Sequence, residues 1–421
     1  MEVRYDMMVN GKLTRGSRTL DVVDPATAEV FAACACASRE EIEDAVTASA
    51  AAFPSWSATS LDERRTVLIK MAEAIETNLE SIARTLTSEQ GKPIGDAQGE
   101  VGGAAYFLRY YAGLEIPVEM IEDSEARRIE LHRRPLGVVA AIVPWNFPVL
   151  TAVNKVGAAL ITGNTVVVKP AATTPLATLQ VAALWRDIVP AGVANIVTDK
   201  NDLGDVLTSH PLVRKVSFTG STTTGMKVMA SGSNTLKRMT LELGGNDSGI
   251  VLDDCDPDIV SQQLFDSAFT NNGQVCIALK RLYVHDSQYD AICSKLAEIA
   301  NATIVGPGSQ QGTQLGPVQN RVQFDKLKTL IEETRTAGTI IAGGDSPEGP
   351  GYFINPTIVR DIPDNARLVT DEQFGPVLPV MRFSDLDDVV ARANDSSFGL
   401  GNSVWSSDSE RAGAVAAQLD S

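Results

Sequence analysis

Apolar positions along the chain follow two different periods, and the change between them divides the sequence. Over residues 38–111 they recur at helical spacing, and Ser38 with Glu41 forms a capping box that marks the start of the first helix. The pattern predicts short strands over 7–12 and 20–25, and helices from Ser38 to about Phe53, from about Leu61 to Glu89, and over 94–111. These apolar stripes are expected to face the core.

From Leu136 onward, apolar runs alternate with helical patterns. Gly137–Val143 is continuously apolar, as expected of a strand buried on both faces. The elements predicted after it are strands over 165–170, 195–197 and 215–219, and helices over 152–160 and 176–187. This βαβαβ order predicts a parallel sheet with helices on its faces. A second α/β region follows Glu242 without a linker or repeat.

A short charged stretch over 117–134 separates the two patterns. Its residues Arg128–His132 alternate between polar and apolar and predict an exposed strand. Such a strand could pack against another subunit or belong to a simple surface hairpin. The pattern alone favours neither reading.

Composition excludes several classes of function. At 421 residues the chain is long enough for two or three domains. Its formal net charge of −17 argues against binding to nucleic acid or to an anionic membrane surface. The apolar run over 137–163 is interrupted by Pro144, Asn146, Pro148, Asn154 and Lys155, which a lipid-exposed helix would not tolerate cheaply.

Cysteine and histidine usage indicates the compartment and limits the chemistry. The five cysteines form no C-x-x-C pair and no even disulfide framework, which is typical of a reducing compartment. The three histidines are widely spaced, so neither a zinc site nor a histidine-based triad is expected. We therefore expect a cytoplasmic protein without a metal.

One cysteine stands in a setting suited to chemistry. Asn271-Asn272-Gly273-Gln274-Val275-Cys276 describes a polar turn with exposed backbone N–H groups. Cys276 could attack a carbonyl there and leave the oxyanion on backbone donors. The alternative is a small buried core residue, because free cysteine is among the most buried residue types.

Gly220-Ser221-Thr222-Thr223-Thr224-Gly225 follows a predicted strand and opens a helix, which is the context of a dinucleotide site. It is not the full G-x-G-x-x-G pattern, so a plain strand-to-helix turn remains an alternative.

Three further stretches carry polar groups beside turns. Asn146, between Pro144 and Pro148, ends a parallel strand and offers an amide to an oxyanion; a proline-bounded turn is the alternative. Glu242 lies between leucines, where burial would raise its pKa and suit it to act as a general base; an exposed turn glutamate is the alternative. Glu372 and Phe374 share one tight turn that could hold a ribose and a flat ring.

Five motifs occur in a fixed order: Pro-Trp-Asn-Phe-Pro at 144–148, Phe-Thr-Gly-Ser at 218–221, Glu-Leu-Gly-Gly at 242–245, Asn-x-Gly-Gln-x-Cys at 271–276 and Glu-x-Phe-Gly-Pro at 372–376. Together they resemble the NAD(P)-dependent aldehyde dehydrogenase superfamily over essentially the whole chain. The resemblance implies an α/β fold with a Rossmann-like dinucleotide-binding domain over 1–116 and 136–246, an oligomerisation strand excursion over 117–135, and a catalytic α/β domain over 247–421.

The resemblance also implies a mechanism. Cys276 would attack the aldehyde to form a thiohemiacetal, while the Asn146 side chain and the Cys276 backbone N–H hold the oxyanion. Hydride transfer to the nicotinamide leaves a thioester, and Glu242 would activate the water that releases the acid. Lys155 matches a lysine that the family keeps near the catalytic centre. Retention of Glu242 speaks against the CoA-acylating branch of the superfamily.

Cofactor and substrate positions follow in the same way. Lys169 would bind the adenosine ribose, Gly220 and Ser221 the pyrophosphate, and Glu372 the nicotinamide ribose. The full set of implied cofactor positions is Val143, Pro144, Trp145, Lys169, Ala172, Phe218, Gly220, Ser221, Leu243, Gly244, Glu372 and Phe374. The positions implied to line the aldehyde tunnel are Phe147, Thr151, Asn154, Val275 and Ile277; they include no arginine for a substrate carboxylate, which favours a medium-sized aliphatic or aromatic aldehyde.

The chain departs from the family at two places. Ala172 stands where many NAD-preferring members carry a glutamate, and Lys200 adds a charge nearby; NAD is still favoured, with NADP possible. Family members usually continue for several dozen residues past the position of Ser421, and that segment supplies a substrate loop and subunit contacts. A homodimer or homotetramer is expected if the segment is dispensable. The alternatives are a catalytically impaired dinucleotide-binding homologue, a CoA-acylating dehydrogenase and a cysteine hydrolase.

Overall fold

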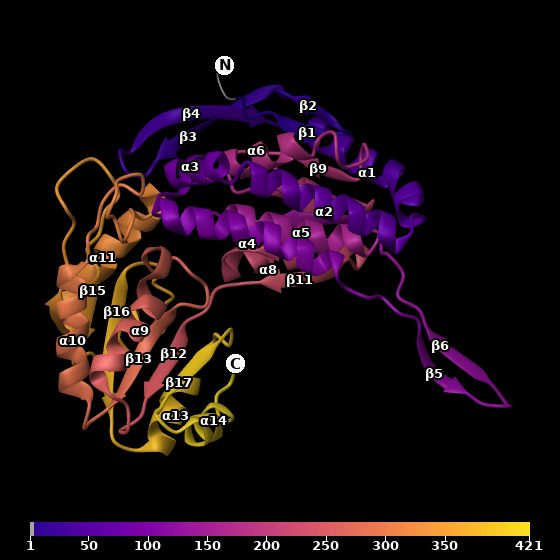
Figure 1. Cartoon of the computed structure of the whole chain (residues 1–421). Helices are drawn as coiled ribbons and strands as arrows, with labels where there is room; N and C mark the ends of the chain where they lie inside the picture. The colour runs from indigo at the N-terminus through magenta and orange to yellow at the C-terminus, as the bar shows by residue number, and fades with distance from the viewer. Residues whose placement is uncertain (1–3) are drawn as a thin grey trace. The chain divides into compact units, whose positions relative to one another are not determined.

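A computed structural model describes residues 4–421, and their contacts form two compact units. Unit 1 consists of 4–23, Val30–Glu89 and Ala97–Glu242, and unit 2 consists of Asp24–Glu29, Gln90–Asp96 and Leu243–Ser421. Figure 1 labels many of their helices and strands. The α/β class predicted from the sequence is confirmed, and the functional roles predicted for the domains stay predictions.

Unit 1 is built on a seven-stranded sheet in the order β11-β10-β7-β8-β9-β1-β2. The five strands from β11 to β9 are parallel, and β1 pairs antiparallel with β9 and β2. The central strands β7 and β8 are buried along their whole length, as their apolar runs predict. The strands are β1 (Met7–Val9), β2 (Lys12–Thr14), β7 (Val138–Ile142), β8 (Thr165–Lys169), β9 (Ala194–Ile196), β10 (Val213–Thr219) and β11 (Arg238–Glu242).

Helices cover both faces of this sheet. The crossover helices α5 and α6 pack on one face with α2 outside them, and α1, α7 and α8 lie together on the other. The helices are α1 (Arg39–Ser57), α2 (Leu61–Thr77), α3 (Leu79–Gln90), α4 (Ile94–Ala112), α5 (Pro148–Ile161), α6 (Leu176–Trp185), α7 (Gly204–Ser209), α8 (Thr222–Gly232) and the 3-10 turn η1 (Ser233–Thr235).

Three predicted helix bounds need correction. The helix expected over 61–89 is two helices, because Asn78 leaves helical geometry and its side-chain amide donates to the Ala74 carbonyl at 2.8 Å. The helix from Ser38 runs on to Ser57, since one proline removes only one backbone donor and the buried Trp56 anchors the last turn. The helix expected from residue 152 begins at Pro148, whose fixed φ suits a first helical position.

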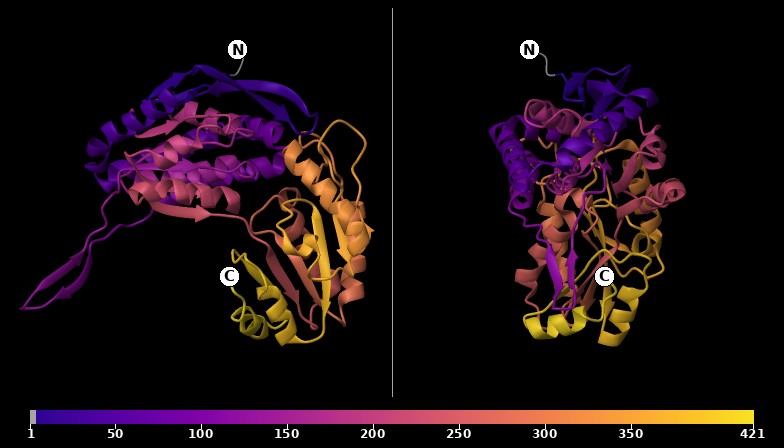
Figure 2. Two further views of the ribbon diagram at one scale, coloured as in Figure 1. Left: turned by 180° about the vertical axis from the view of Figure 1, so that it is seen from behind. Right: turned by 90° about the vertical axis from the view of Figure 1, so that its right-hand side faces the viewer.

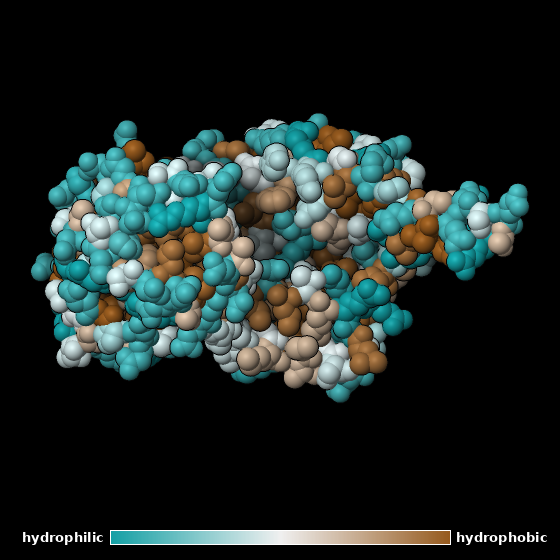
Figure 3. All heavy atoms as spheres, turned by 90° about the horizontal axis from the view of Figure 1, so that it is seen from below, coloured by the Kyte–Doolittle hydropathy of each residue, from teal (hydrophilic) through white to brown (hydrophobic). Residues whose placement is uncertain are grey.

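The stretch predicted as an exposed strand forms a hairpin that projects from unit 1 (Figure 1 and Figure 2). Its strands β5 (Glu119–Asp123) and β6 (Arg128–Leu131) pair antiparallel, and all of β6 is exposed. The projection at the right of Figure 3 mixes polar and apolar side chains. The exposed apolar residues here are Val118, Met120, Ile121, Ile129 and Leu131. A second two-stranded ribbon pairs β3 (Arg18–Asp24) with β4 (Glu29–Cys36).

Unit 2 holds a six-stranded sheet in the order β14-β15-β16-β13-β12-β17, parallel except for β14. Its strands are β12 (Asp247–Val251), β13 (Leu279–His285), β14 (Thr339–Ala342), β15 (Thr357–Arg360), β16 (Val377–Phe383) and β17 (Asn402–Trp405). Its helices are α9 (Pro257–Phe269), the 3-10 turn η2 (Thr270–Gly273), α10 (Tyr289–Ala302), α11 (Arg321–Ala337), α12 (Arg367–Thr370), α13 (Leu386–Asn394) and α14 (Ser409–Ala416). Side chains of α9, α10 and the central strands form its core.

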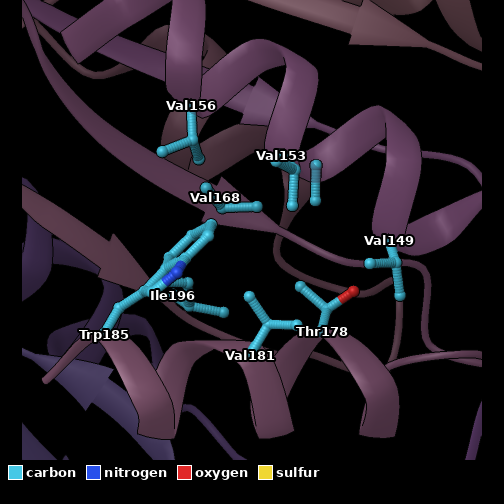
Figure 4. Close-up of a pocket in the computed structure, with 9 residues that line it drawn as sticks. Val149, Val153, Val156, Val168, Thr178, Val181, Trp185 and Ile196 are labelled. Atoms are coloured by element: carbon cyan, nitrogen blue, oxygen red, sulfur yellow. The ribbon is translucent and has the colours of Figure 1, made fainter. Parts of the chain in front are cut away.

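A small apolar cavity of about 10 Å³ lies inside unit 1, between α5, α6 and strands β8 and β9. Figure 4 shows Val149, Val153, Val168 and Trp185 pointing into it. A space this small with apolar walls is expected to stay dry. We therefore interpret it as a packing defect of the core.

Across residues 4–421, the structure contains no helix that combines the length and the apolar character needed to cross a bilayer.

Candidate active site

The predicted site residues of unit 1 gather at one edge of its sheet. β7 lies between β8 and β10, so the chain winds outward from it in both directions. Such a switch point opens a crevice at the carboxyl ends of the strands, where ligands bind. The loop 143–147 follows β7, Gly220 follows β10, Lys169 ends β8 and Glu242 ends β11. Residues that are far apart in the sequence thus share one edge.

Asn146 is buried in the loop that leads into α5. The N-cap of α5 offers no side-chain hydrogen bond to the helix. Instead, Oε1 of Glu100 on α4 accepts the backbone N–H groups of Val149 at 2.9 Å and Leu150 at 3.1 Å. Because Glu100 is itself buried, a carboxylate from another helix caps α5 and fixes one end of the Asn146 loop.

The next helix is capped in the same manner. The N-cap of α6 makes no side-chain hydrogen bond, and the buried Glu89 accepts the N–H groups of Leu176 at 2.6 Å and Ala177 at 2.9 Å. Burial raises the pKa of Glu89 to about 8, and the two N–H groups act in the opposite direction. Sequence reasoning missed both carboxylates. Neither glutamate carries a local signal of this role, since the partners lie 49 and 87 residues away.

Lys155 lies in the middle of α5, and its Nζ donates to Ser217 Oγ at 2.9 Å. Burial lowers the pKa of Lys155 to about 8, while the nearby Glu242 acts in the opposite direction. Glu242 itself is exposed, so the expectation that its leucine neighbours bury it is wrong. β11 is the edge strand of the sheet, and a side chain at its end meets solvent.

Lys169 is buried at the end of β8 and held by the loop after β9. Its Nζ pairs with Asp199 Oδ1 at 2.7 Å and donates to Asn201 Oδ1 at 3.0 Å. Ala172 is half-buried in the following loop, and Lys200 is exposed. The amine is therefore fixed in place at the adenosine side of the predicted cofactor site, where its donors suit ribose hydroxyls.

Gly220 and Ser221 form the turn into α8. Ser221 Oγ accepts the N–H of Thr224 at 3.3 Å, and the first turn of α8 contains no acidic residue. A Cβ on Gly220 would lie 2.6 Å from the buried Phe218 ring, which explains the glycine. The positive end of a helix dipole favours a phosphate anion. Together with the Lys169 amine, this donor set fits a dinucleotide.

The predicted site residues of unit 2 lie at the opposite kind of edge. Leu243–Asn246 precedes β12, Val275–Ala278 precedes β13, and Glu372–Pro376 precedes β16. Because β16, β13 and β12 are parallel neighbours, the three loops lie side by side at the amino-terminal edge, with Cys276 in the middle. Ligands of open α/β sheets usually bind at the carboxyl ends of the strands, so this rule does not locate the residues around Cys276.

A left-handed turn leads to the cysteine. Asn271 and Asn272 have φ values of 50° and 59°, and Gly273 follows at 70°. Asparagine and glycine adopt this conformation at the least steric cost, which explains the Asn-Asn-Gly motif. A Cβ on Gly273 would lie 2.4 Å from the carbonyl oxygen of Gly375. The cysteine turn therefore packs against the Glu372–Pro376 loop.

All five cysteines lie within the described residues; four are buried and Cys276 is partly exposed. Its neighbour Ile277 is 64% exposed, and Val275 is half-buried. Burial raises the pKa of the Cys276 thiol above its ordinary value, Lys280 opposes this rise, and Glu372 adds to it. The thiol is therefore largely protonated at neutral pH, and its attack on a carbonyl requires a base.

The two glycines after Glu242 make room for site residues of unit 2. Glu372 Oε1 accepts the N–H of Gly245 at 3.0 Å. A Cβ on Gly244 would lie 2.3 Å from Glu372 Oε2, and one on Gly245 would lie 2.5 Å from the Cys276 carbonyl oxygen. Burial raises the pKa of Glu372, which the Gly245 N–H opposes. A side chain at Gly244 would thus collide with Glu372, and one at Gly245 would collide with the cysteine loop.

Helix α11 fixes the Glu372–Pro376 loop. Lys326 Nζ donates to the Glu372 carbonyl at 2.8 Å, and Gln323 Nε2 donates to the carbonyls of Gln373 and Phe374. Phe374 adopts φ 52°, a conformation that L-residues rarely take. Such a backbone persists where its surroundings hold it in place, and the α11 side chains do this here.

The predicted substrate residues divide between the units. Phe147, Thr151 and Asn154 lie on the start of α5 in unit 1, whereas Val275 and Ile277 flank Cys276 in unit 2. Asn154 Oδ1 accepts the hydroxyl of Tyr111 from α4 at 3.2 Å, a partner that sequence reasoning missed. Within residues 4–421, no three His, Cys, Asp or Glu side chains are grouped so as to hold a metal ion.

Comparison with known proteins identifies the family. Residues 13–421 match the model of the aldehyde dehydrogenase family. A probable aldehyde dehydrogenase of Pseudomonas sp is 41% identical over 94% of this chain and 81% of that protein. The succinate-semialdehyde dehydrogenase [NADP(+)] of Escherichia coli K12 is 37% identical over 99% of this chain and 88% of that protein.

The solved structures agree. An aldehyde dehydrogenase from Bacillus cereus in complex with NAD+ superimposes with a TM-score of 0.96 at 35% identity, over 99% of this chain and 87% of that chain. The five motifs, the two α/β units and these matches lead to one conclusion: the chain belongs to the aldehyde dehydrogenase family and is an NAD(P)-dependent oxidoreductase that oxidises aldehydes to carboxylic acids.

Proposed function

We propose that Cys276 is the nucleophile of this oxidation. The observation that carries the proposal is its setting: the only partly exposed cysteine of the described chain follows a left-handed polar turn and lies between the Gly244–Gly245 and Glu372 loops. The Cys276 thiol loses its proton to water, the thiolate sulfur forms a bond to the aldehyde carbon, and the carbonyl electron pair moves to oxygen. The Cys276 backbone N–H and the Asn146 amide donate to that oxyanion.

Collapse of the thiohemiacetal expels a hydride from carbon and leaves a thioester on Cys276. When bound, the oxidised nicotinamide supplies the acceptor for that hydride. Glu242 then removes a proton from water as the water attacks the thioester, and the carboxylic acid and the free thiol are released. The exposure of Glu242 at the end of β11 suits a residue that meets water. The positive charge of Lys155 attracts the nearby Glu242 carboxylate.

We assign the binding of the dinucleotide to motif residues of both units. Lys169 binds the adenosine ribose, Gly220 and Ser221 lie against the pyrophosphate, and Glu372 binds the nicotinamide ribose. Val143, Pro144, Trp145, Ala172, Phe218, Leu243, Gly244 and Phe374 complete the assigned contacts. We assign NAD as the preferred cofactor, with NADP accepted. NADP is accepted because Ala172 replaces a carboxylate that would repel its 2′-phosphate. NAD is preferred because neither Ala172 nor Lys200 builds a defined phosphate pocket.

The substrate is assigned to uncharged aldehydes of medium size. Phe147, Thr151, Asn154, Val275 and Ile277 supply aromatic, aliphatic and neutral polar groups and no cation. A relative named for succinate semialdehyde is named for an aldehyde that carries a carboxylate at its other end. We expect the present chain to prefer a neutral aliphatic or aromatic aldehyde over such a substrate.

Assembly and location are part of the proposal. The exposed apolar residues of the β5–β6 hairpin favour a homodimer or homotetramer built through this hairpin. The free cysteines favour the cytoplasm.

The test is NADH formation by the full chain with NAD or NADP, against hexanal, benzaldehyde and succinate semialdehyde. Steady turnover without CoA supports the hydrolytic mechanism, and a CoA requirement supports the acylating alternative. Cys276→Ala should abolish turnover and retain dinucleotide binding. Glu242→Gln should give a burst of NADH about equal to the enzyme, followed by slow turnover, because acylation precedes the step that needs the base. Dinucleotide binding without NADH production by the unmodified chain would contradict the proposal.

A further inference from the structure

Lys280 is a buried cation beside the nucleophile that no part of the mechanism above uses. It is the second residue of β13 and is 2% exposed. An ammonium in such a place loses its hydration and must be compensated by hydrogen bonds and by negative charge. Its contacts therefore indicate what it does.

All three donors of the ammonium go to one loop. Nζ of Lys280 donates to the carbonyl oxygens of Cys276 at 2.6 Å, Val275 at 2.8 Å and Ala278 at 3.3 Å. These carbonyls lie on both sides of the Cys276 side chain, so the lysine closes the loop around the nucleophile. The carbonyl of Lys280 in turn accepts Gln373 Nε2 at 3.0 Å, which ties the loop to the Glu372 turn.

The three carbonyl partners are neutral, so the positive charge is balanced by groups further away. The negative groups that face Lys280 are Asp247 from β12, Glu372 from the loop before β16, and the Cys276 thiolate. Among the groups that act on Cys276, Lys280 does most to favour the thiolate, whereas burial and Glu372 disfavour it. Arg281, the next residue, donates to the Asn246 carbonyl at 2.7 Å, in the loop that precedes β12.

We propose that Lys280 is the positioning residue of Cys276, which holds the backbone on both sides of the nucleophile and supplies the positive charge that its thiolate needs. The proposal rests on Cys276 being the nucleophile. This arrangement explains how a half-buried thiol can ionise, because a fixed cation hydrogen-bonded to its loop lowers the free energy of the anion.

The test measures thiol reactivity, so it needs neither aldehyde nor dinucleotide. The full chain is treated with iodoacetamide over a range of pH, and the rate of alkylation at Cys276 is followed by peptide mass spectrometry. The variants are Lys280→Met, which removes charge and donors, Lys280→Gln, which keeps a donor, and Lys280→Arg, which keeps the charge. Lys237→Met is the matched control: it removes a partly buried lysine of unit 1 that donates to two backbone carbonyls, those of His210 and Val213.

Near neutral pH we expect alkylation to slow by about tenfold in Lys280→Met and Lys280→Gln, with the pH profile displaced to higher pH. Lys280→Arg should recover most of the rate, and Lys237→Met should follow the unmodified chain. Circular dichroism checks folding; if Lys280→Met does not fold, the comparison of Lys280→Gln with Lys280→Arg decides the question. Superimposable profiles for those two variants and the unmodified chain would overturn the role of Lys280. Alkylation of Cys276 that leaves turnover intact would instead overturn Cys276 as the nucleophile.

Discussion

The carboxylate of Glu100 offers a sharp test of how the Asn146 loop is held. Both N–H groups that it caps bond to the same oxygen, Oε1, at 2.9 and 3.1 Å. Glu100→Ala removes both bonds, whereas Glu100→Gln keeps an amide oxygen that can accept both. The pair of variants therefore separates loss of the cap from loss of the charge.

The size of the effect follows from helix capping. Loss of an N-cap acceptor costs about 0.5–2 kcal/mol of stability, and the higher figure applies where the freed N–H groups are buried. Glu100 is 4% exposed and Val149 is fully buried, so we expect Glu100→Ala to lower the free energy of unfolding of unit 1 by about 2 kcal/mol. Glu100→Gln should cost less than half of this.

Urea unfolding followed by circular dichroism measures the change, with the midpoint shifting at constant slope. Because Asn146 lies next to the freed helix end, kcat should fall by roughly tenfold or more in Glu100→Ala, since small misplacements of an oxyanion donor are costly. Dinucleotide affinity should change less. If Glu100→Ala unfolds within about 0.5 kcal/mol of the unmodified chain, or if Glu100→Gln costs as much, the capping argument is wrong.

Three further outcomes are expected. Gly244→Ala would place a Cβ 2.3 Å from Glu372 Oε2; the displaced carboxylate should weaken NAD binding by about tenfold in a fluorescence titration, and an unchanged Kd would count against Glu372 as a ribose ligand. Ala172→Glu adds a carboxylate after Lys169, so the ratio of kcat/KM for NAD to that for NADP should rise; a constant ratio would remove this position from cofactor choice. Burial lowers the pKa of Lys155 from 10.5 to about 8, so between these values the unfolded chain binds the extra proton and stability rises with pH. Lys155→Met should lack that rise, as urea unfolding at several pH values would reveal; equal slopes would refute the assignment.

Local pattern was sufficient for the α/β class and for the cysteine turn. The buried parallel strands β7 and β8 follow from continuous apolar runs, because a strand covered on both faces has no polar side to show. The Asn271–Gly273 turn follows from residue types that tolerate positive φ. Both properties depend on neighbours in the sequence.

Errors arose where the answer depended on the environment of a residue. Glu242 sits between leucines in the sequence, yet it is exposed, because β11 is an edge strand of the sheet. The helix over 61–89 breaks at Asn78, where a side-chain hydrogen bond competes with the apolar period. Glu89 and Glu100 could not be recognised as helix caps, since each acts on a helix start that is distant in the chain.

Side-chain type and local spacing were enough to predict the alternation of strands and helices, the chemistry of the motifs and their order. Which residues lie together depended on how the strands are arranged in the fold. Strand order brings Asn146, Lys169 and Gly220 to one carboxyl edge, and it brings the loops of Cys276 and Glu372 to one amino edge. It also buries Lys280 under the cysteine loop. Burial and long-range hydrogen bonds set these roles, and neither is a property of neighbouring residues in the chain.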